Sequence, residues 1–557
     1  MTLRLVLRYG VMLLFSLLAA LGDCWSSVDV AIKRARAMKP LLLGEASVHR
    51  LLGDVLLEHD GAIMSCDSAY LFQENNRFRA YGHVVILSKG LRIAGDSLYY
   101  EGESGTGRIF GQNVELRDTV QNYTLWSDLL DYDTRENLVR FTTWGRMRSE
   151  ANELESLRGE YLANQSLSIL SGEVRFQGEE LRSYSDTLEY HRNEAMLYLW
   201  GNIRMYRLEQ VGICNKGWDN LQSKESELQG NVAFRDRGEH FFADRLFIYG
   251  QRKDLEAFGH VLLEDSARRD RIYSQHLFYW SEPRRVVADQ QPMLYQVDST
   301  HVRHDTLFMR ADKFEVKSEE IVRAADSLGE RFDTVYHTWA LGQCRSFRND
   351  FQIACDTLYL NGRDSTFSLM GKPYPYFWNE EAQISAVHIT GYLGKSALDS
   401  LLLEEKVFLG SHDRGEYYNQ MTGLTMRAYL RDNALDVIHI DGDGDVIFFM
   451  REDDELLGIN RVKSPRYKIR MEEGRAAQAT FYSETESLIS PIQETEQEDR
   501  LLYGFAWRGD LRPTSPRDVI PAWLHDLDFH FPLRARIDAC YEHEGGVARK
   551  MQWRHNI

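Results

Sequence analysis

The sequence predicts an all-β fold, an elongated and open β-solenoid-like stack of short antiparallel strands with about 29 residues in each rung. Three observations predict this fold. A Gly-x-Val/Ile motif recurs at intervals of 29 residues, and an Asp-centred motif follows it by 14 residues. Within the motifs, apolar and polar residues alternate with a period of two, which is typical of strands that bury one face.

Composition agrees with such a fold. The 557 residues are 43% apolar and 27% charged, so the chain is able to bury a core. Aromatic residues reach 12% and only 11 prolines occur, which favours pleated strands over other structures. The formal net charge of −18 argues against nucleic acid as a partner, because that partner requires a basic surface.

The first 22 residues are expected to be a secretory signal peptide. Arg4 and Arg8 precede an apolar run that ends at Leu21, and Gly22 provides a small residue for cleavage. The run is shorter than the roughly 20 residues that a membrane-spanning helix needs. We therefore expect an exported, soluble protein. An outer-membrane lipoprotein anchored through Cys24 is the less favoured alternative, because Asp23 fits a lipidation motif poorly.

The Gly-x-Val/Ile motif marks the successive rungs. Its regular copies are Gly53-Asp54-Val55, Gly82-His83-Val84, Gly172-Glu173-Val174, Gly201-Asn202-Ile203, Gly230-Asn231-Val232 and Gly259-His260-Val261. Gly111 keeps the spacing, whereas Gly145-Arg146-Met147 is displaced, which indicates a loop insertion. Later rungs are expected at Asp312, Asp356 and Gly444-Asp445-Val446. We expect each glycine at a tight corner, with the Asp-Ser/Thr pairs at the opposite corner of the rung.

The alternation assigns one set of side chains to the inside of the stack. The expected inward residues are apolar and recur in pairs of equal parity: Val55, Leu57, Val84, Ile86, Leu98, Tyr100, Leu130, Val174, Phe176, Leu188, Ile203, Val232, Phe234, Leu246, Ile248, Val261 and Leu263. Periodicity alone favours a core that these side chains fill by themselves, but it does not separate a filled core from an open groove.

No motif indicates catalysis, and we expect no enzyme and no cofactor. Paired carboxylates of a polysaccharide-cleaving solenoid are the enzymatic alternative, but the aspartates recur at every rung, as structural residues would. Asp441, Asp443, Asp445 and Glu452 have the spacing of a calcium loop, although strand-like flanks favour a polar hairpin turn. His301 and His304 are expected in a solvated loop. Cys344 and Cys355 could form a disulfide in an oxidising compartment.

A cluster of prolines and aromatic residues between Lys372 and Trp378 interrupts the pattern. We expect a domain boundary there. The predicted organisation is a signal peptide at 1–22, a repeat region at 23–372, a second β region at 379–515 and a tail of unassigned structure at 516–557.

Together, the export signal, the Asp-Ser-Leu-x-Tyr and Gly-x-Val strands, and the segments Asn419-Gln420…Gly423 and Trp507-Arg508…Arg512-Pro513 resemble the OstA-like proteins. These belong with the LptA family of lipopolysaccharide transport. The likeness covers roughly residues 40–515 and is greatest to the long form found in Bacteroidota. This chain differs from the short periplasmic member in its many more rungs and its additional C-terminal region.

The resemblance implies a twisted, open β-jellyroll in the periplasm, whose apolar interior holds acyl chains. The inward residues above then become candidates for a lipid groove. Lipopolysaccharide or its lipid A part is the implied cargo, and other jellyroll proteins of a transport bridge are the implied partners, bound through open edge strands. Membrane contact is expected only through partners. The alternative is a structural or adhesive surface β-solenoid without lipid cargo.

Overall fold

A computed structural model describes residues 30–524, apart from short gaps at 44–45, 73, 75, 266–269, 299–304, 327–328, 380–381, 395–397, 432–433, 453–454 and 473–474. The expected signal peptide, Cys24, His301, His304 and most of the C-terminal tail lie outside the described residues. The chain divides into two compact units between Asn202 and Ile203. Within the described part, no helix has the length and hydropathy to cross a membrane.

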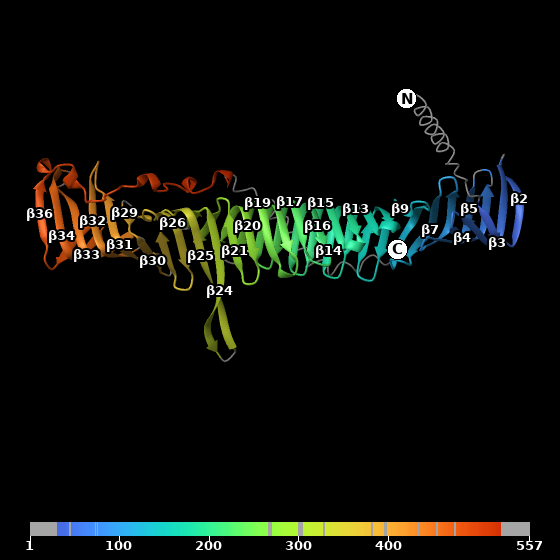
Figure 1. The fold of residues 1–557 in the computed structure, drawn as a ribbon, viewed down its shortest axis with the longest axis horizontal. Helices are drawn as coiled ribbons and strands as arrows, with labels where there is room; N and C mark the ends of the chain where they lie inside the picture. Colours follow the sequence, from blue (N-terminus) through green and yellow to red (C-terminus); the bar gives the residue numbers. More distant parts are fainter. Residues whose placement is uncertain are drawn as a thin grey trace, which may run out of the picture. The chain divides into compact units, whose positions relative to one another are not determined.

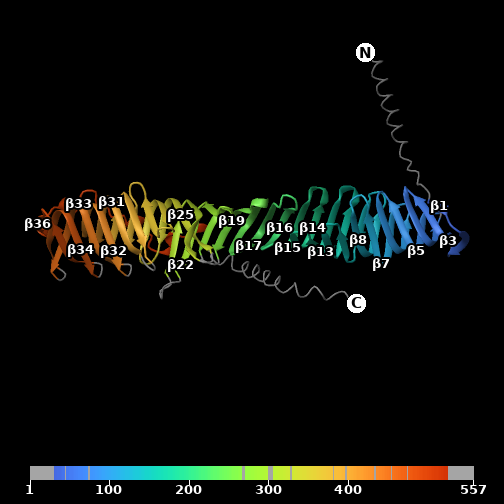
Figure 2. The ribbon, with the colours of Figure 1, turned by 90° about the horizontal axis from the view of Figure 1, so that it is seen from below.

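Unit 1 consists of antiparallel strands that follow one another in sequence order (Figures 1 and 2). They are β1 (Ala31–Arg34), β2 (Ala37–Leu43), β3 (Ala46–His59), β4 (Ala62–Phe72), β5 (Arg77–Ser88), β6 (Leu91–Glu101), β7 (Thr106–Asp118), β8 (Tyr123–Asp133), β9 (Leu138–Phe141), β10 (Gly145–Arg148), β11 (Glu153–Ser156), β12 (Arg158–Leu162), β13 (Leu167–Gln177), β14 (Leu181–His191) and the first part of β15 (Met196–Arg207).

Unit 2 begins within β15 and continues the same antiparallel pattern. Its further strands are β16 (Gln210–Asn220), β17 (Ser226–Asp236), β18 (Glu239–Tyr249), β19 (Asp254–Asp265), β20 (Arg271–Trp280), β21 (Arg285–Asp289), β22 (Met293–Asp298), β23 (Asp305–Arg310), β24 (Lys313–Asp326), β25 (Gly329–Phe347), β26 (Gln352–Asn361), β27 (Thr366–Met370), β28 (Tyr376–Asn379), β29 (Ala382–Ser385), β30 (His388–Leu393), β31 (Leu398–His412), β32 (Tyr418–Arg431), β33 (Ala434–Glu452), β34 (Glu455–Glu472), β35 (Arg475–Tyr482) and β36 (Glu486–Pro491).

The all-β prediction is confirmed, and the pairing shows what one 29-residue repeat is. β5 pairs antiparallel with β4 and with β6, so consecutive strands form a continuous meander. Each of these strands is 11 or 12 residues long. One repeat is therefore a hairpin of two long strands. The stack of antiparallel strands with a period of 29 residues is as predicted, and the two strands of each period are longer than predicted.

Each long strand bends once, at a β-bulge. In β5 the two residues Gly82 and His83 lie opposite the single residue Asp96 of β6, and the register shifts there. Both bulge residues have left-handed backbone angles, with φ of +78° and +44°. On the other side, the Asp67 carboxylate of β4 lies 2.7 Å from Nδ1 of His83. Glycine and aspartate therefore alternate along one row of corners on neighbouring strands, and the prediction that they occupy opposite corners is wrong.

Two glycines that were predicted to mark corners lie just inside them. The bend between β9 and β10 falls at residues 142–144, and Gly145 pairs with Ser127 of β8. The bulge of β33 is Gly442-Asp443, so Gly444 lies beyond it. At both glycines an added Cβ would meet an aromatic ring, that of Phe141 or of Tyr467. These glycines make room for an inward ring rather than for a turn.

The bend gives each unit two facing half-sheets with an interior between them. Turns join neighbouring strands at the free margin of both half-sheets. We call the first row of turns row A: 60–61, 89–90, 119–122, 149–152, 178–180, 208–209 and 237–238. The second is row B: 76, 102–105, 134–137, 163–166, 192–195, 221–225, 250–253 and 281–284. The space between the two rows is called the mouth of the interior.

Two features of unit 2 depart from this pattern. β24 and β25 pair with each other from Ser318 to Asp326, well past row B, and project from the sheet as a separate hairpin (Figure 1). Residues 492–524 contain only short 3-10 turns, from Ile492–Glu494 to Ala522–Leu524, and run back along the outside of the unit (Figure 1). We call this second segment the strap. The prolines at 373 and 375 lie between β27 and β28 inside unit 2, and the domain boundary expected there remains a prediction.

Candidate functional site

The predicted inward residues all lie in the interior. All seventeen side chains from Val55 to Leu263 are buried, with at most 6% of any residue exposed. They come from both half-sheets: in β5, Val84 lies on one side of the bend, and in β6, Leu98 lies on the other. Within each unit, the structure therefore brings the two apolar series together as the two walls of the interior.

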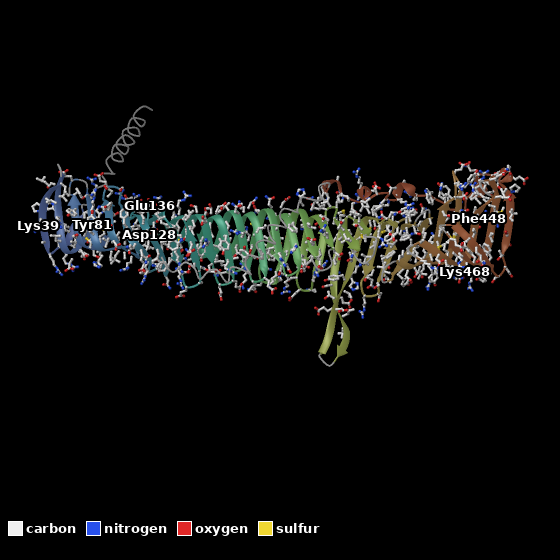
Figure 3. The ribbon with its side chains drawn as sticks, turned by 180° about the vertical axis from the view of Figure 1, so that it is seen from behind. Lys39, Tyr81, Asp128, Glu136, Phe448 and Lys468 are labelled. Atoms are coloured by element: carbon white, nitrogen blue, oxygen red, sulfur yellow. The ribbon has the colours of Figure 1, made fainter. Side chains whose placement is uncertain are left out.

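The outer faces of the same strands are polar or only partly covered. On β5, Val84 and Ile86 are buried. Leu87, which lies between Ile86 and Ser88, is 46% exposed. Side chains such as Lys39, Asp128 and Glu136 extend outward from unit 1 (Figure 3). This contrast assigns the inside and the outside of the sheet as the period-two pattern predicted.

In unit 1, polar contacts cross the mouth from row A to row B. His59 Nδ1 lies 2.7 Å from the Tyr100 hydroxyl. The Tyr161 hydroxyl donates to Asp118 at 2.7 Å. Further contacts of the same kind are Lys89 Nζ to the Thr134 carbonyl at 2.7 Å, Arg192 Nη1 to the Gln121 carbonyl at 3.0 Å, and Asn152 Nδ2 to the Tyr190 hydroxyl at 3.0 Å. These contacts hold the two half-sheets of unit 1 against each other.

In unit 2 the corresponding contacts are ion pairs. Arg207 beside row A binds both carboxylate oxygens of Asp219 beside row B, at 2.9 and 2.8 Å. Asp219 is fully buried, and that burial raises its pKa although Arg207 opposes the shift. Arg284 of row B contacts Glu239 and lies 3.3 Å from Asp265, both at the row A margin. Burial also raises the pKa of Glu239.

A cavity of about 90 Å³ lies between the half-sheets directly inside the Arg284 contacts. Its apolar walls come from both half-sheets: Leu263, Ile272 and Leu294 on one side, and Val286, Phe314, Val316 and Leu360 on the other. Arg284, Asp265 and Tyr336 lie at its polar end. Of the predicted inward residues, Leu263 lines this cavity. The polar residues of the mouth were not predicted, although charged and aromatic residues next to turns were a visible signal.

The other sequence-based hypotheses concern cysteines and metals. Cys344 and Cys355 are direct cross-strand partners on β25 and β26, and both are free and buried. Asp441 and Asp445 pair with Arg466 at 3.1 Å and with Arg461 at 2.7 Å. They flank the bulge of β33, so the predicted hairpin turn is not present at this position. Over the described residues, no three histidine, cysteine or acidic side chains gather closely enough to hold a metal ion.

The contacts of the strap account for two motif segments that do not belong to the 29-residue repeat. The buried amide of Gln420 accepts from Leu502 N at 2.8 Å and donates to the Arg500 carbonyl at 2.9 Å. Gln383 holds the strap in the same way, through Arg508 N at 2.6 Å and the Ala506 carbonyl at 2.8 Å. The strap thereby covers outward apolar side chains of β33 and β28, among them Phe449 and Trp378.

Comparison with known proteins places the N-terminal part of the chain. The family of OstA-like proteins matches residues 28–186. Among solved structures, the chain is similar to LptH from Pseudomonas aeruginosa, described as the LptA homologous periplasmic component of the conserved lipopolysaccharide transport device. The two are 9% identical over 25% of this chain and 95% of that chain, with a TM-score of 0.19. No curated protein matches. The match identifies residues 28–186 as an OstA-like region.

Proposed function

We propose that this protein carries lipopolysaccharide, or its lipid A part, through the periplasm toward the outer membrane. Its acyl chains would lie in the interior between the half-sheets. The observation that carries the proposal is the interior itself, whose two walls are apolar in strand after strand of both units. The match to OstA-like proteins and the predicted signal peptide support the same function and location.

The physical basis of the proposal is solvation. Moving one methylene of an acyl chain from apolar surroundings into water costs about 0.8 kcal/mol of free energy. The interior presents similar aliphatic and aromatic side chains at each repeat, for example Val84, Val174, Val232 and Val261. Because neighbouring positions are alike, a chain could pass from one to the next without being held at a single deep minimum.

The proposed partners are other jellyroll proteins bound at the terminal strands. β2 pairs with β3 along one of its edges, and every residue of β2 is exposed, including Leu42 at 75%. At the other terminus, β36 pairs with β34, and Leu488 and Ile489 are exposed. Edge strands with exposed apolar residues favour pairing with a strand of another chain.

The test is to purify the mature protein from a host that makes lipopolysaccharide and to measure bound lipid A by mass spectrometry. Lipid A is expected at a fixed ratio to protein. Val84→Asp places a charge in the interior and should abolish binding. The matched control, Leu87→Asp, makes the same change on the outer face of the same strand and should retain lipid. A wild-type protein free of lipid A, or a folded Val84→Asp variant that retains it, would disprove the proposal.

A second candidate function is a structural or adhesive surface β-protein without lipid cargo. The observation that favours it is the close packing of the interior, where residues such as Leu98, Leu130 and Leu188 have no exposed surface. This candidate predicts that lipid A is absent from both the wild type and the Leu87→Asp variant. The same measurement therefore separates the two functions.

A further inference from the structure

Arg284 is the centre of a polar contact that closes the mouth of unit 2. Its guanidinium reaches from row B to Glu239 and Asp265 at the row A margin. The same guanidinium contacts the hydroxyl of Tyr336 and lies 5.0 Å from the centre of the Tyr336 ring. All these groups are partly or mostly buried, so they hold the two half-sheets together at one point.

The space behind Arg284 differs from the space behind the Asp118–Tyr161 contact of unit 1. The cavity of about 90 Å³ begins beneath this contact and has apolar walls on both half-sheets. Behind the Asp118–Tyr161 contact of unit 1, in contrast, the Tyr123 ring lies 5.4 Å from the Tyr161 ring, and both rings are buried. An acyl chain that passed Arg284 would meet free apolar space, whereas one that passed Tyr161 would meet a filled core.

The projecting hairpin begins at this same point. Ser318 of β24 donates its amide to the Arg284 carbonyl at 3.1 Å, and Ser318 pairs with Tyr336 of β25. Beyond this pair the two strands leave the sheet and pair only with each other among the described residues. Arg284 is thus joined both to the opposite half-sheet and to the base of the hairpin. A second polar hollow adjoins it, lined by Arg237, Arg252 and Glu282 of the neighbouring turns.

We propose that the mouth opens between Arg284 and the Glu239–Asp265 pair, and that this opening admits a single acyl chain of an amphiphile into the cavity behind it. This inference rests on the proposed function and specifies where the cargo enters. The polar group of the amphiphile stays among the charged residues of the mouth, where water and charge are available. Inside the cavity, the acyl chain contacts both walls. These contacts take the place of the contacts between the walls, because both walls are apolar. Arg284 and Tyr336 are positioning residues that keep the mouth closed.

The first experiment measures the rate of uptake of dansylaminoundecanoic acid, a fluorescent fatty acid, by stopped-flow fluorescence. Arg284→Gln removes the ion pairs and should accelerate uptake about tenfold. Tyr336→Phe removes one hydroxyl contact and should accelerate it about threefold. Tyr161→Phe makes the identical change at the filled part of the mouth in unit 1 and should leave the rate unchanged. Circular dichroism and thermal unfolding confirm that each variant is folded.

The second experiment measures opening directly. Nitroxide labels are attached to Arg237→Cys and Glu282→Cys, exposed turn positions in row A and row B, after the native cysteines are replaced by alanine. Pulsed dipolar spectroscopy should show a longer distance when the fatty acid is added. A control pair, Arg252→Cys and Glu282→Cys, lies entirely in row B and should show no change.

The outcomes distinguish the inference from the proposed function. Uptake with equal rates in all variants and an unchanged distance between Arg237→Cys and Glu282→Cys would disprove the Arg284 opening and leave lipid carriage intact. Absence of any fatty acid and lipid A binding, in the wild type and in every variant, would disprove both. Faster uptake in the two variants at Arg284 and Tyr336, with a longer distance on loading, would support the inference.

Discussion

Gly82 shows how one residue sets the bend of a strand. Its φ of +78° lies in the left-handed region, and an added Cβ would clash with the carboxylate of Asp67 on the neighbouring strand. Left-handed backbone costs about 1–2 kcal/mol for a residue with a Cβ. Conformation and close approach therefore both require glycine here, and the 29-residue spacing repeats this requirement.

We expect Gly82→Ala to lower the free energy of unfolding by about 2–4 kcal/mol, because the variant combines left-handed strain with a clash. The control is Gly61→Ala, where φ is +73° but an added Cβ would meet nothing within 4 Å. That variant should lose only about 1 kcal/mol. Urea unfolding measures both, and equal losses would show that the Asp67 contact is unimportant.

The Arg207–Asp219 pair gives a prediction with a defined pH dependence. Arg207→Gln should lower the free energy of unfolding by about 3–5 kcal/mol at pH 7, because it leaves the buried carboxylate of Asp219 unpaired. The folded pKa of Asp219 is already raised by burial, and losing Arg207 raises it further. Because the pKa of Asp219 is higher in the folded state than in the unfolded state, the folded state binds the proton at a higher pH. Stability of the variant therefore increases as the pH falls through that pKa toward 3.8, the ordinary pKa of an aspartate.

Urea unfolding of the Arg207→Gln variant at pH 7 and pH 5 checks this prediction. The loss relative to wild type should be smaller at the lower pH. Arg237→Gln serves as the control, because Arg237 and its partner Glu209 are both more than 70% exposed. That variant should change stability by at most about 0.5 kcal/mol at either pH. A loss that grows on acidification would contradict the assignment of Asp219.

At the scale of elements, the strap depends on side chains of the sheet beneath it. It has only short 3-10 turns of its own, so buried amides such as Gln383 and Gln420 supply the hydrogen bonds that a neighbouring strand would otherwise supply. Each amide contacts two strap residues that are two positions apart, which suits an extended backbone.

Gln383→Met keeps the length of the side chain but removes both hydrogen bonds to the strap. We expect trypsin to cleave after Arg508 about tenfold faster in this variant, because the strap detaches more often. Gln251→Met, a change in an exposed turn, should leave the cleavage rate at the wild-type value. Limited proteolysis followed by mass spectrometry identifies the cleavage site.

Cys344 of β25 and Cys355 of β26 lie next to the bulge of β25. The two residues are cross-strand partners, so we expect oxidised glutathione to convert both thiols into one disulfide and to be reduced itself. Peptide mapping without reductant should then recover a linked peptide pair, which disappears after reduction. Recovery of both as free thiols after prolonged oxidation would show that the strands do not bring the sulfur atoms together.

For the whole molecule, bound lipid is expected to stabilise both walls of the interior. A ligand that binds only the folded state, at one hundred times its Kd, raises the free energy of unfolding by about 2.7 kcal/mol. Calorimetry of delipidated protein with added lipid A should show this increase. The deacylated disaccharide of lipid A should show none, and an equal effect of both would assign binding to the headgroup alone.

The sequence by itself determined the all-β class, the bends at most of the repeated glycines and the inward faces. Those features depend on local physics: a left-handed bulge needs glycine, and a period of two places alternate side chains on opposite faces, as Val84 and Leu87 show. Gly145 and Gly444 were predicted to lie at corners, and that prediction was wrong. At both positions glycine leaves room for an aromatic ring that a Cβ would meet. Local spacing cannot distinguish that cause from a turn.

Only the tertiary structure decided how the interior closes and what covers the outside. The contact of Arg284 with Glu239 joins residues of different turns, and it exists only because each strand bends enough for its two ends to meet. The strap contact between Gln383 and Arg508 spans 125 residues. Such contacts depend on the bend angle and on the path of the chain, which no repeat spacing encodes. The 29-residue repeat thus specifies an interior with two walls, and the folded chain determines where that interior can open.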